Sequence, residues 1–190
     1  MAIDVEAIVV DALLALVEDE GIPLERVTIK RILERSGVSR QTFYNHFLDK
    51  NDLICQTYEQ RMVRAFNEAG PTFAYRDELV DAFGRMRKHG EFLGQACRMT
   101  GQNNLCDHML DRAQNFDLMW HRRLLGKDLP EGLRLATIYH VSASVQLTIA
   151  WILGGFAESE ENLADLICQM RGIGMGAYFD SSDVPSNPYA

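Results

Sequence analysis

The sequence predicts an all-α protein of two helical domains, and two observations support this fold class. Apolar residues recur at helical spacing along most of the chain, whereas no stretch alternates apolar and polar residues as a half-buried strand does. Hydrophobic residues make up 47% of the 190 residues and charged residues 24%, as in an ordinary globular protein. A chain of this length can bury one or two sizeable cores.

The first helix is expected from about Asp4, which can cap it, to about Asp19. Gly21 and Pro23 then end it. One face of this helix carries a stripe of apolar residues, namely Val5, Ile8, Val9, Ala12, Leu13, Leu16 and Val17. This stripe predicts a helix that supports the segment after it.

Two short helices joined by a turn are predicted between Val27 and Lys50. Thr28 can cap the first helix and Ser39 the second, and an apolar residue precedes each cap. Gly37 lies between them and can adopt the left-handed conformation that ends a helix. This arrangement is typical of a helix-turn-helix motif.

The second of these helices has two distinct faces. Phe43 and Phe47, four residues apart, are expected to face the core. The outward residues are Arg40, Gln41, Tyr44 and Asn45. Arg, Gln and Asn can form paired hydrogen bonds with base edges, and Thr42, Tyr44, His46 and Lys50 can reach phosphates. The alternative is a solvated helix face in an ordinary bundle.

These residues resemble the TetR family of bacterial transcriptional regulators. The matching pattern is Thr28, Gly37-Val38-Ser39, Thr42-Phe43-Tyr44-Asn45-His46-Phe47 and Lys50; Arg31 and Leu33 depart from it, since an acid and a small Ala are common there. The resemblance implies that Lys30, Arg40, Gln41 and Asn45 approach bases and that Thr28, Thr42, Tyr44, His46 and Lys50 contact the DNA backbone. The candidate DNA-binding residues are Thr28, Lys30, Ser39, Arg40, Gln41, Thr42, Tyr44, Asn45, His46 and Lys50.

The net charge of −8 opposes nucleic-acid binding overall, but the charge is unevenly distributed. Residues 1–25 hold seven acids and no Lys or Arg, whereas residues 27–50 hold five bases against Glu34 and Asp49. The predicted helix-turn-helix is therefore locally positive, as DNA binding requires.

The remaining chain is expected to be helical. Asp49 can cap a fourth helix that runs through Met62 and Phe66 to Gly70-Pro71. Further helices are predicted at about Asp77–Lys88, Glu91–Met99, Asn103–Leu125, Pro130–Leu153 and Ser159–Gly172. The expected domains are 1–50 for DNA binding and 51–180 for effector binding and dimerisation, followed by a flexible tail at 181–190.

Residues 135–157 carry no formal charge. Their length alone would permit a membrane span, but Ser, Thr, Gln and His recur within the segment. We expect a dimer interface instead, because a helix that is apolar on all sides needs cover on all sides. The candidate interface residues are His140, Ser144, Leu147, Trp151, Ile167 and Met170. The Trp151–Gly155 ending resembles the branch of the family related to the dihydroxyacetone-kinase operon activator.

Aromatic and Met residues in the C-terminal half can line an adaptable pocket, although the same residues fill any core. The family resemblance implies an effector pocket in this half. The candidates are Phe83, Met86, Phe92, Met99, Met109, Phe116, Met119, Trp120, His121 and Tyr139. His121 lies one turn after Asp117 and can orient a polar ligand group, but a surface pair explains this spacing as well.

We therefore expect a homodimeric regulator that binds a palindromic double-stranded DNA operator, most simply a repressor released by an unknown small-molecule effector. An activator that works with a protein partner is the alternative, and so is a helical enzyme that uses Asp117 with His121 or His140. The four cysteines lack metal-ligand spacing, and no cofactor or metal is expected. The N-terminus has no signal-peptide pattern, so we expect a cytoplasmic protein without membrane attachment.

Overall fold

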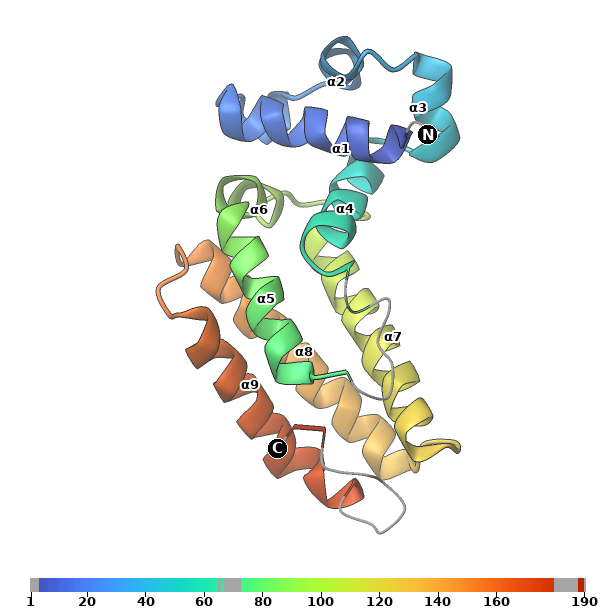
Figure 1. The fold of residues 1–190 in the computed structure, drawn as a ribbon, viewed down its shortest axis with the longest axis vertical. Coiled ribbons are helices and arrows are strands. Elements are labelled where there is room, and N and C mark those ends of the chain that lie inside the picture. Colours follow the sequence, from blue (N-terminus) through green and yellow to red (C-terminus); the bar gives the residue numbers. More distant parts are fainter. Residues whose placement is uncertain (1–3, 65, 67–72, 180–187, 190) are drawn as a thin grey trace.

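A computed structural model describes residues 4–64, 66, 73–179 and 188–189, and this part of the chain contains helices and no strand. The N-terminal head lies across one end of an elongated helical body (Figure 1). The head consists of α1 (Val5–Leu14), the π-helical turn η1 (Ala15–Asp19), the 3₁₀ turn η2 (Leu24–Arg26), α2 (Ile29–Ser36) and α3 (Arg40–His46). The all-α prediction is confirmed.

The helices of the head begin at the residues that the sequence predicts. The side chains of Asp4, Thr28 and Ser39 each accept a hydrogen bond from the backbone N–H three residues later, at 3.0, 3.3 and 3.1 Å. Gly37 ends α2 with φ of 69°, in the left-handed region where a residue without Cβ is favoured. These local bonds fix the turn between α2 and α3.

The core of the head forms where α1 packs against α2. Val9, Leu13, Ile32, Phe43 and Phe47 are all buried. Ile8 departs from the predicted stripe, since 37% of its surface is exposed and Val10 and Leu14 are buried beside it. The π turn of η1 then shifts the face that the end of this helix presents.

Helix α4 (Lys50–Arg61) leads from the head into the body. The body consists of α5 (Tyr75–Lys88), α6 (Gly90–Ala96), α7 (Leu105–Leu125), α8 (Glu131–Leu153), α9 (Glu160–Met175) and the 3₁₀ turn η4 (Gly176–Tyr178). Helix α8 packs against both α7 and α9, and α5 packs against α9. The predicted helices therefore all form, and apart from the C-terminal end of α4 their ends shift by only a few residues.

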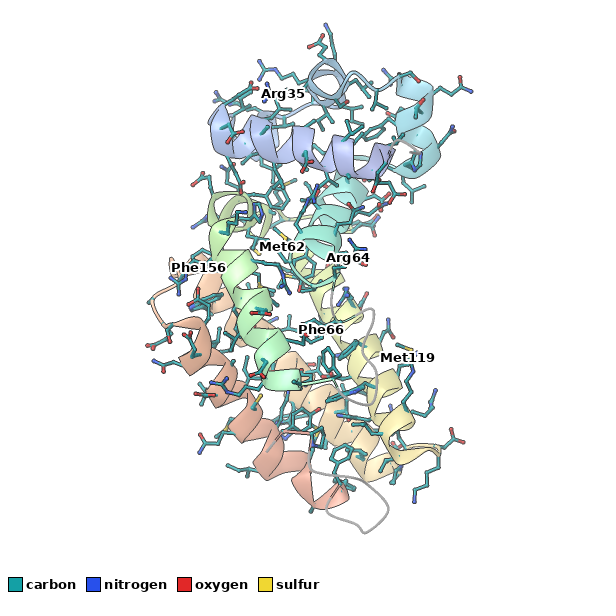
Figure 2. The ribbon with its side chains drawn as sticks, in the orientation of Figure 1. Arg35, Met62, Arg64, Phe66, Met119 and Phe156 are labelled. Carbon is teal, nitrogen blue, oxygen red and sulfur yellow. The ribbon has the colours of Figure 1, made fainter. Side chains whose placement is uncertain are left out.

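Helix α4 ends earlier than predicted, at Arg61. Two arginines of the body bind the backbone carbonyl oxygens just after Arg61. Arg85 Nε donates to Met62 O at 2.8 Å, and Arg112 Nη2 donates to Val63 O at 3.3 Å. Phe66 is still buried and lies between α5 and α7 (Figure 2). The predicted end at Gly70-Pro71 lies outside the described residues.

Helix α8 is long and apolar enough to cross a membrane by length and composition, a test that core helices of other proteins also pass. It approaches α9 closely. A Cβ on Gly174 would lie 1.8 Å from His140 Nε2, so any larger residue there would require the His140 side chain to move. His140 thus packs between α8 and α9 of its own chain.

The C-terminal end departs from the predicted frayed tail at Tyr189, whose exposed fraction is 6%. Its ring contacts Tyr75, Trp120 and His121, with centroids 5.1 to 6.0 Å apart. Aromatic packing and the hydrogen bond between Tyr189 and His121 hold this residue against the body. Residues 180–187 and 190 lie outside the described part of the chain.

Candidate nucleic-acid interface and ligand cavity

The outer face of α3 is polar and its inner face is apolar. Phe43 and Phe47 are fully buried, whereas Arg40, Gln41, Tyr44 and Asn45 are exposed, as the spacing predicts. The Arg40 guanidinium lies 5.5 Å from the centroid of the Tyr44 ring. This contact orients a cationic group at the start of the helix beside an exposed phenol.

The short hydroxyl side chains around α3 serve the head itself. The Ser39 and Thr42 hydroxyl oxygens are 2.8 Å apart, and Ser39 also caps α3. Thr28 caps α2. Lys30 is exposed, with its ammonium 3.7 Å from Glu34. Thr28, Lys30 and Ser39 are nevertheless exposed, and Thr42 is partly exposed.

Lys50 does not project outward with the other candidates. Its ammonium donates hydrogen bonds to the carbonyl oxygens of Leu24, Val27 and Glu25, at 3.1, 3.1 and 3.4 Å. Burial lowers the pKa of Lys50, while the Glu25 charge opposes that shift. The donors of this ammonium hold η2 and the residues just before α2, so the phosphate contact, which stays a prediction, would have to replace one of these hydrogen bonds.

His46 is also committed within the head. Its Nδ1 lies 3.1 Å from the Glu6 carboxylate, which joins the end of α3 to α1. The phosphate contact expected for His46 stays a prediction; in this structure the side chain lies against Glu6, 40 residues earlier in the chain. The pair fixes the orientation of α3 on α1.

A second connection between head and body was not anticipated from the sequence. The Leu24 N–H in η2 donates to Gln95 Oε1 in α6 at 2.6 Å. His89 Nδ1, at the end of α5, lies 3.1 Å from the Glu18 carboxylate of η1. The head is therefore held by α6 as well as by α4, through contacts that no local sequence pattern reveals.

The body contains a cavity of about 70 Å³ where the end of α4 meets α5, α7, α8 and α9. Of the ten residues predicted to line a pocket, Phe83, Met86, Met109 and Phe116 do so. The remaining lining residues are Tyr58, Val63, Phe66, Tyr75, Leu79, Ala82, Arg112, Ala113, Asp117, Ser144, Val145, Thr148, Ile167 and Arg171. The cavity is mainly apolar with one polar wall.

The other six predicted pocket residues lie elsewhere. Phe92, Trp120 and His121 are buried in the packed interior, and Met99 is partly buried against it. Met119 and Tyr139 are exposed by 44% and 70%, and Figure 2 shows Met119 on the outer side of α7. Sequence spacing identified helix faces but not which buried rings border empty space.

The polar wall of the cavity is built around a buried ion pair between Asp117 of α7 and Arg171 of α9. Arg171 Nη1 donates to Asp117 Oδ2, and both side chains are almost fully buried. The guanidinium also lies over the rings of Tyr75 and Tyr189, at 4.9 and 5.7 Å. One feature of the sequence points to this ion pair: Arg171 is the single basic residue of helix α9.

Burial and the partner's charge shift the pKa of each member of this ion pair in opposite directions. Burial raises the pKa of Asp117, although the Arg171 charge opposes that shift. Burial disfavours the charged guanidinium, but the Asp117 carboxylate raises the pKa of Arg171 above its usual value. Two buried charges in contact are kept together because either one alone would be costly.

Asp117 and His121 do not form the pair considered from their spacing. His121 Nδ1 lies 2.9 Å from the Thr137 hydroxyl, and its Nε2 contacts the Tyr189 hydroxyl. Burial lowers the pKa of His121 to about 3, and the Arg171 charge adds to that shift. This imidazole is thus neutral and used in packing the base of the body.

The predicted interface residues divide into two groups. Leu147 and Met170 are exposed on the outer face of α8 and α9, and His140 and Ser144 are partly buried. Trp151 and Ile167 are buried inside their own chain, so they are not available to a partner. Five further large apolar residues are exposed on the same two helices, namely Leu135, Tyr139, Leu153, Leu166 and Ile173.

Comparison with known proteins covers both parts of the chain. Residues 9–56 match the family model described as bacterial regulatory proteins, tetR family. No curated protein sequence matches the chain. The solved structure named dihydroxyacetone kinase operon activator DhaS is similar over 93% of this chain and 98% of its own, with a TM-score of 0.70 and 18% identity.

A second solved structure, a putative TetR-family transcriptional regulator from Syntrophomonas wolfei str. Goettingen, is also similar. The match covers 90% of this chain and 95% of that one, with a TM-score of 0.55 and 13% identity. At these identities the two structures establish a shared fold across head and body.

Proposed function

We propose that this chain, whose residues 9–56 match the tetR family of bacterial regulatory proteins, is a homodimeric transcriptional regulator that leaves its palindromic operator when a small molecule enters the body. The observation that carries this proposal is the polar outer face of α3 on a packed helix-turn-helix. We assign residues 1–50 to DNA binding and 51–180 to effector binding and dimerisation.

We propose that α3 enters the major groove. Arg40, Gln41 and Asn45 are exposed and have side chains that can form paired hydrogen bonds with base edges. Tyr44, Thr42 and Lys30 lie where they can contact phosphates. His46 and Lys50 instead keep α3 and η2 in place, and Ser39 and Thr28 contribute through the helix N-termini that they cap.

We propose that the outer face of α8 and α9 forms the dimer interface. Its exposed apolar side chains lie at helical spacing, with Leu135, Tyr139 and Leu147 on α8 and Leu166, Met170 and Ile173 on α9. A contiguous apolar surface of this kind is rare on a monomer in water. A two-fold pair would cover it and would present two copies of α3.

Ligand binding and DNA binding are coupled in this proposal through the end of α4. Tyr58, Val63 and Phe66 line the cavity, and the backbone oxygens of Met62 and Val63 are held by Arg85 and Arg112. A ligand that prefers one position of this segment therefore shifts the position of the head. Operator affinity falls by the ligand's preference between the two states.

Activation is the second candidate function, because the similar structure DhaS is named an operon activator. The DNA-binding and dimer surfaces are the same in either case. A reporter gene placed behind the chain's own upstream region separates the two: deletion of the regulator raises expression for a repressor and lowers it for an activator.

A band-shift with DNA from upstream of its own gene tests the proposal. The unmutated protein should shift this DNA in the presence of excess unrelated competitor. Arg40→Ala should weaken the specific complex by about 1–3 kcal/mol and relax the preference at one base position, because it removes a paired contact with a base. Arg122→Ala, an exposed change at the far end of α7, is the control. Equal binding to upstream and unrelated DNA would refute the proposal.

A further inference from the structure

The cavity in the body contains a buried hydrogen-bond acceptor that lacks a donor. Asp117 is 1% exposed, and its Oδ2 is bonded to Arg171. Its Oδ1 has no hydrogen-bond partner among the described residues, although the Tyr75 phenol lies near enough to this carboxyl to lower its pKa. An unsatisfied buried carboxylate oxygen is unfavourable, so it marks the position where a donor from outside the chain would be stabilised.

The hydroxyl groups of Ser144 and Thr148, on the same wall, have already used their donors. Ser144 Oγ donates to His140 O at 2.7 Å, and Thr148 Oγ1 donates to Ser144 O at 2.9 Å. Arg171 Nε donates to Ser144 Oγ at 3.3 Å. These two hydroxyl groups therefore offer only acceptors to a ligand.

We propose that the cavity binds a compact neutral hydroxyl compound, whose O–H donates to Asp117 Oδ1 while its apolar part packs against Phe83, Met86 and Phe116. The proposal deepens the effector role proposed above and rests on it. The hydroxyl group fits because it supplies the missing donor, and the walls fit because most of the lining residues are apolar or aromatic.

The charge of the wall selects against ions. Asp117 and Arg171 neutralise each other, so a neutral ligand leaves the buried site uncharged. A cationic or anionic ligand would bury a net charge without a counterion, which is costly.

The size of the cavity limits the ligand to a few heavy atoms. Its volume of about 70 Å³ is roughly half that of the 150 Å³ engineered apolar cavity that admits benzene. Met86 and Met109 border the cavity, and their flexible side chains can make some additional room. A chain of about four carbons is therefore a suitable probe.

Three probes of similar size separate the features of the proposal: 1-butanol, its isomer methyl propyl ether, and n-butylammonium. Binding is followed by NMR of the protein with ¹³C-labelled Met methyl groups. 1-Butanol should shift the Met86 and Met109 signals saturably and leave those of the exposed Met119 and Met170 in place. The ether should bind on the order of tenfold more weakly, because it leaves Oδ1 without a donor. Butylammonium should bind more weakly still.

Two variants and one control test whether 1-butanol binds in this cavity beside Asp117. Ala113→Leu fills the cavity and should abolish binding of 1-butanol, whereas Asn115→Leu, on the exposed side of the same helix, should not. The double variant Asp117→Leu with Arg171→Met replaces the ion pair by apolar side chains, a change that proteins often tolerate. In this variant the alcohol and the ether should bind equally. If it fails to fold, the probe series and Ala113→Leu decide the question.

Equal binding of alcohol and ether to the unmutated protein would overturn the proposal, as would preferred binding of the ammonium ion or no binding at all. These results need no DNA. Failure of the ligand chemistry is therefore distinguishable from failure of the regulatory function, which the band-shift tests separately.

Discussion

Gln95 in α6 accepts a hydrogen bond from the Leu24 N–H in η2, with 2.6 Å between Oε1 and N. Leu24 is fully buried, so its N–H has no access to water as an alternative partner. The bond joins the body to the DNA-binding head at a point distant from α4. Together with the His89–Glu18 contact, it connects the head to the body at a place other than α4.

Replacing Gln95 by Ala should loosen this second contact. The buried Leu24 N–H loses its acceptor, which should cost about 1–3 kcal/mol. Hydrogen exchange of the Leu24 amide should accelerate, and thermal unfolding should begin at a lower temperature. Gln114→Ala, which removes a side-chain bond to Ser142 within the body, is a matched control. Unchanged exchange at Leu24 in Gln95→Ala would show that the bond does not hold the head.

Lys50→Met should destabilise the head rather than remove a phosphate contact. Three backbone carbonyl oxygens lose a charged donor, and hydrogen bonds of this kind contribute about 1.5–3 kcal/mol. Urea unfolding of the variant should show this loss. The slope of log affinity against log salt should stay unchanged for the folded variant, since no counterion is released at this site. A slope reduced by about one unit would instead place Lys50 on the DNA.

Ile173→Glu should dissociate the dimer. Ile173 is 74% exposed in the single chain, so the change is harmless to the protomer fold but places a charge in the proposed interface. Light scattering should give twice the monomer mass for the unmutated protein and the monomer mass for the variant. Leu48→Glu is the control, because Leu48 is exposed in the head. A monomeric unmutated protein would contradict the interface.

His121 should make stability depend on pH. Its pKa is about 3 in the folded chain against 6.5 when unfolded, so only the unfolded chain takes up a proton between these values. The stability from this group is complete above pH 6.5 and is lost as pH falls, by up to about 1.4 kcal/mol per pH unit. Urea unfolding at pH 7 and pH 5 should show a gap between unmutated protein and His121→Gln that shrinks by about 2 kcal/mol. Parallel pH profiles would count against a neutral buried imidazole.

Features set by short stretches of chain were predictable. The caps at Asp4, Thr28 and Ser39 and the turn at Gly37 depend on residues three or four apart, and all four formed as expected. The inward and outward faces of α3 follow from helical spacing in the same way.

Features set by distant segments were not predictable. Lys50 matches the family pattern, yet its ammonium binds carbonyls more than 20 residues away. Asp117 and Arg171 are 54 residues apart, and neither position shows by itself that the other is its partner. The end of α4 was placed too late, because arginines of other helices bind the carbonyl oxygens of Met62 and Val63 just after it.

The central claim is that a rigid dimer presents two α3 helices to one face of the DNA. Two such helices fit half-sites separated by about one helical turn, roughly 34–36 Å, or a multiple of it. The most direct measurement is a band-shift titration on the operator and on the same operator with about 5 additional base pairs at its dyad, which rotates one half-site to the opposite face. We predict loss of tight binding with weak half-site binding retained, whereas equal tight binding to both DNAs would contradict the two-headed dimer.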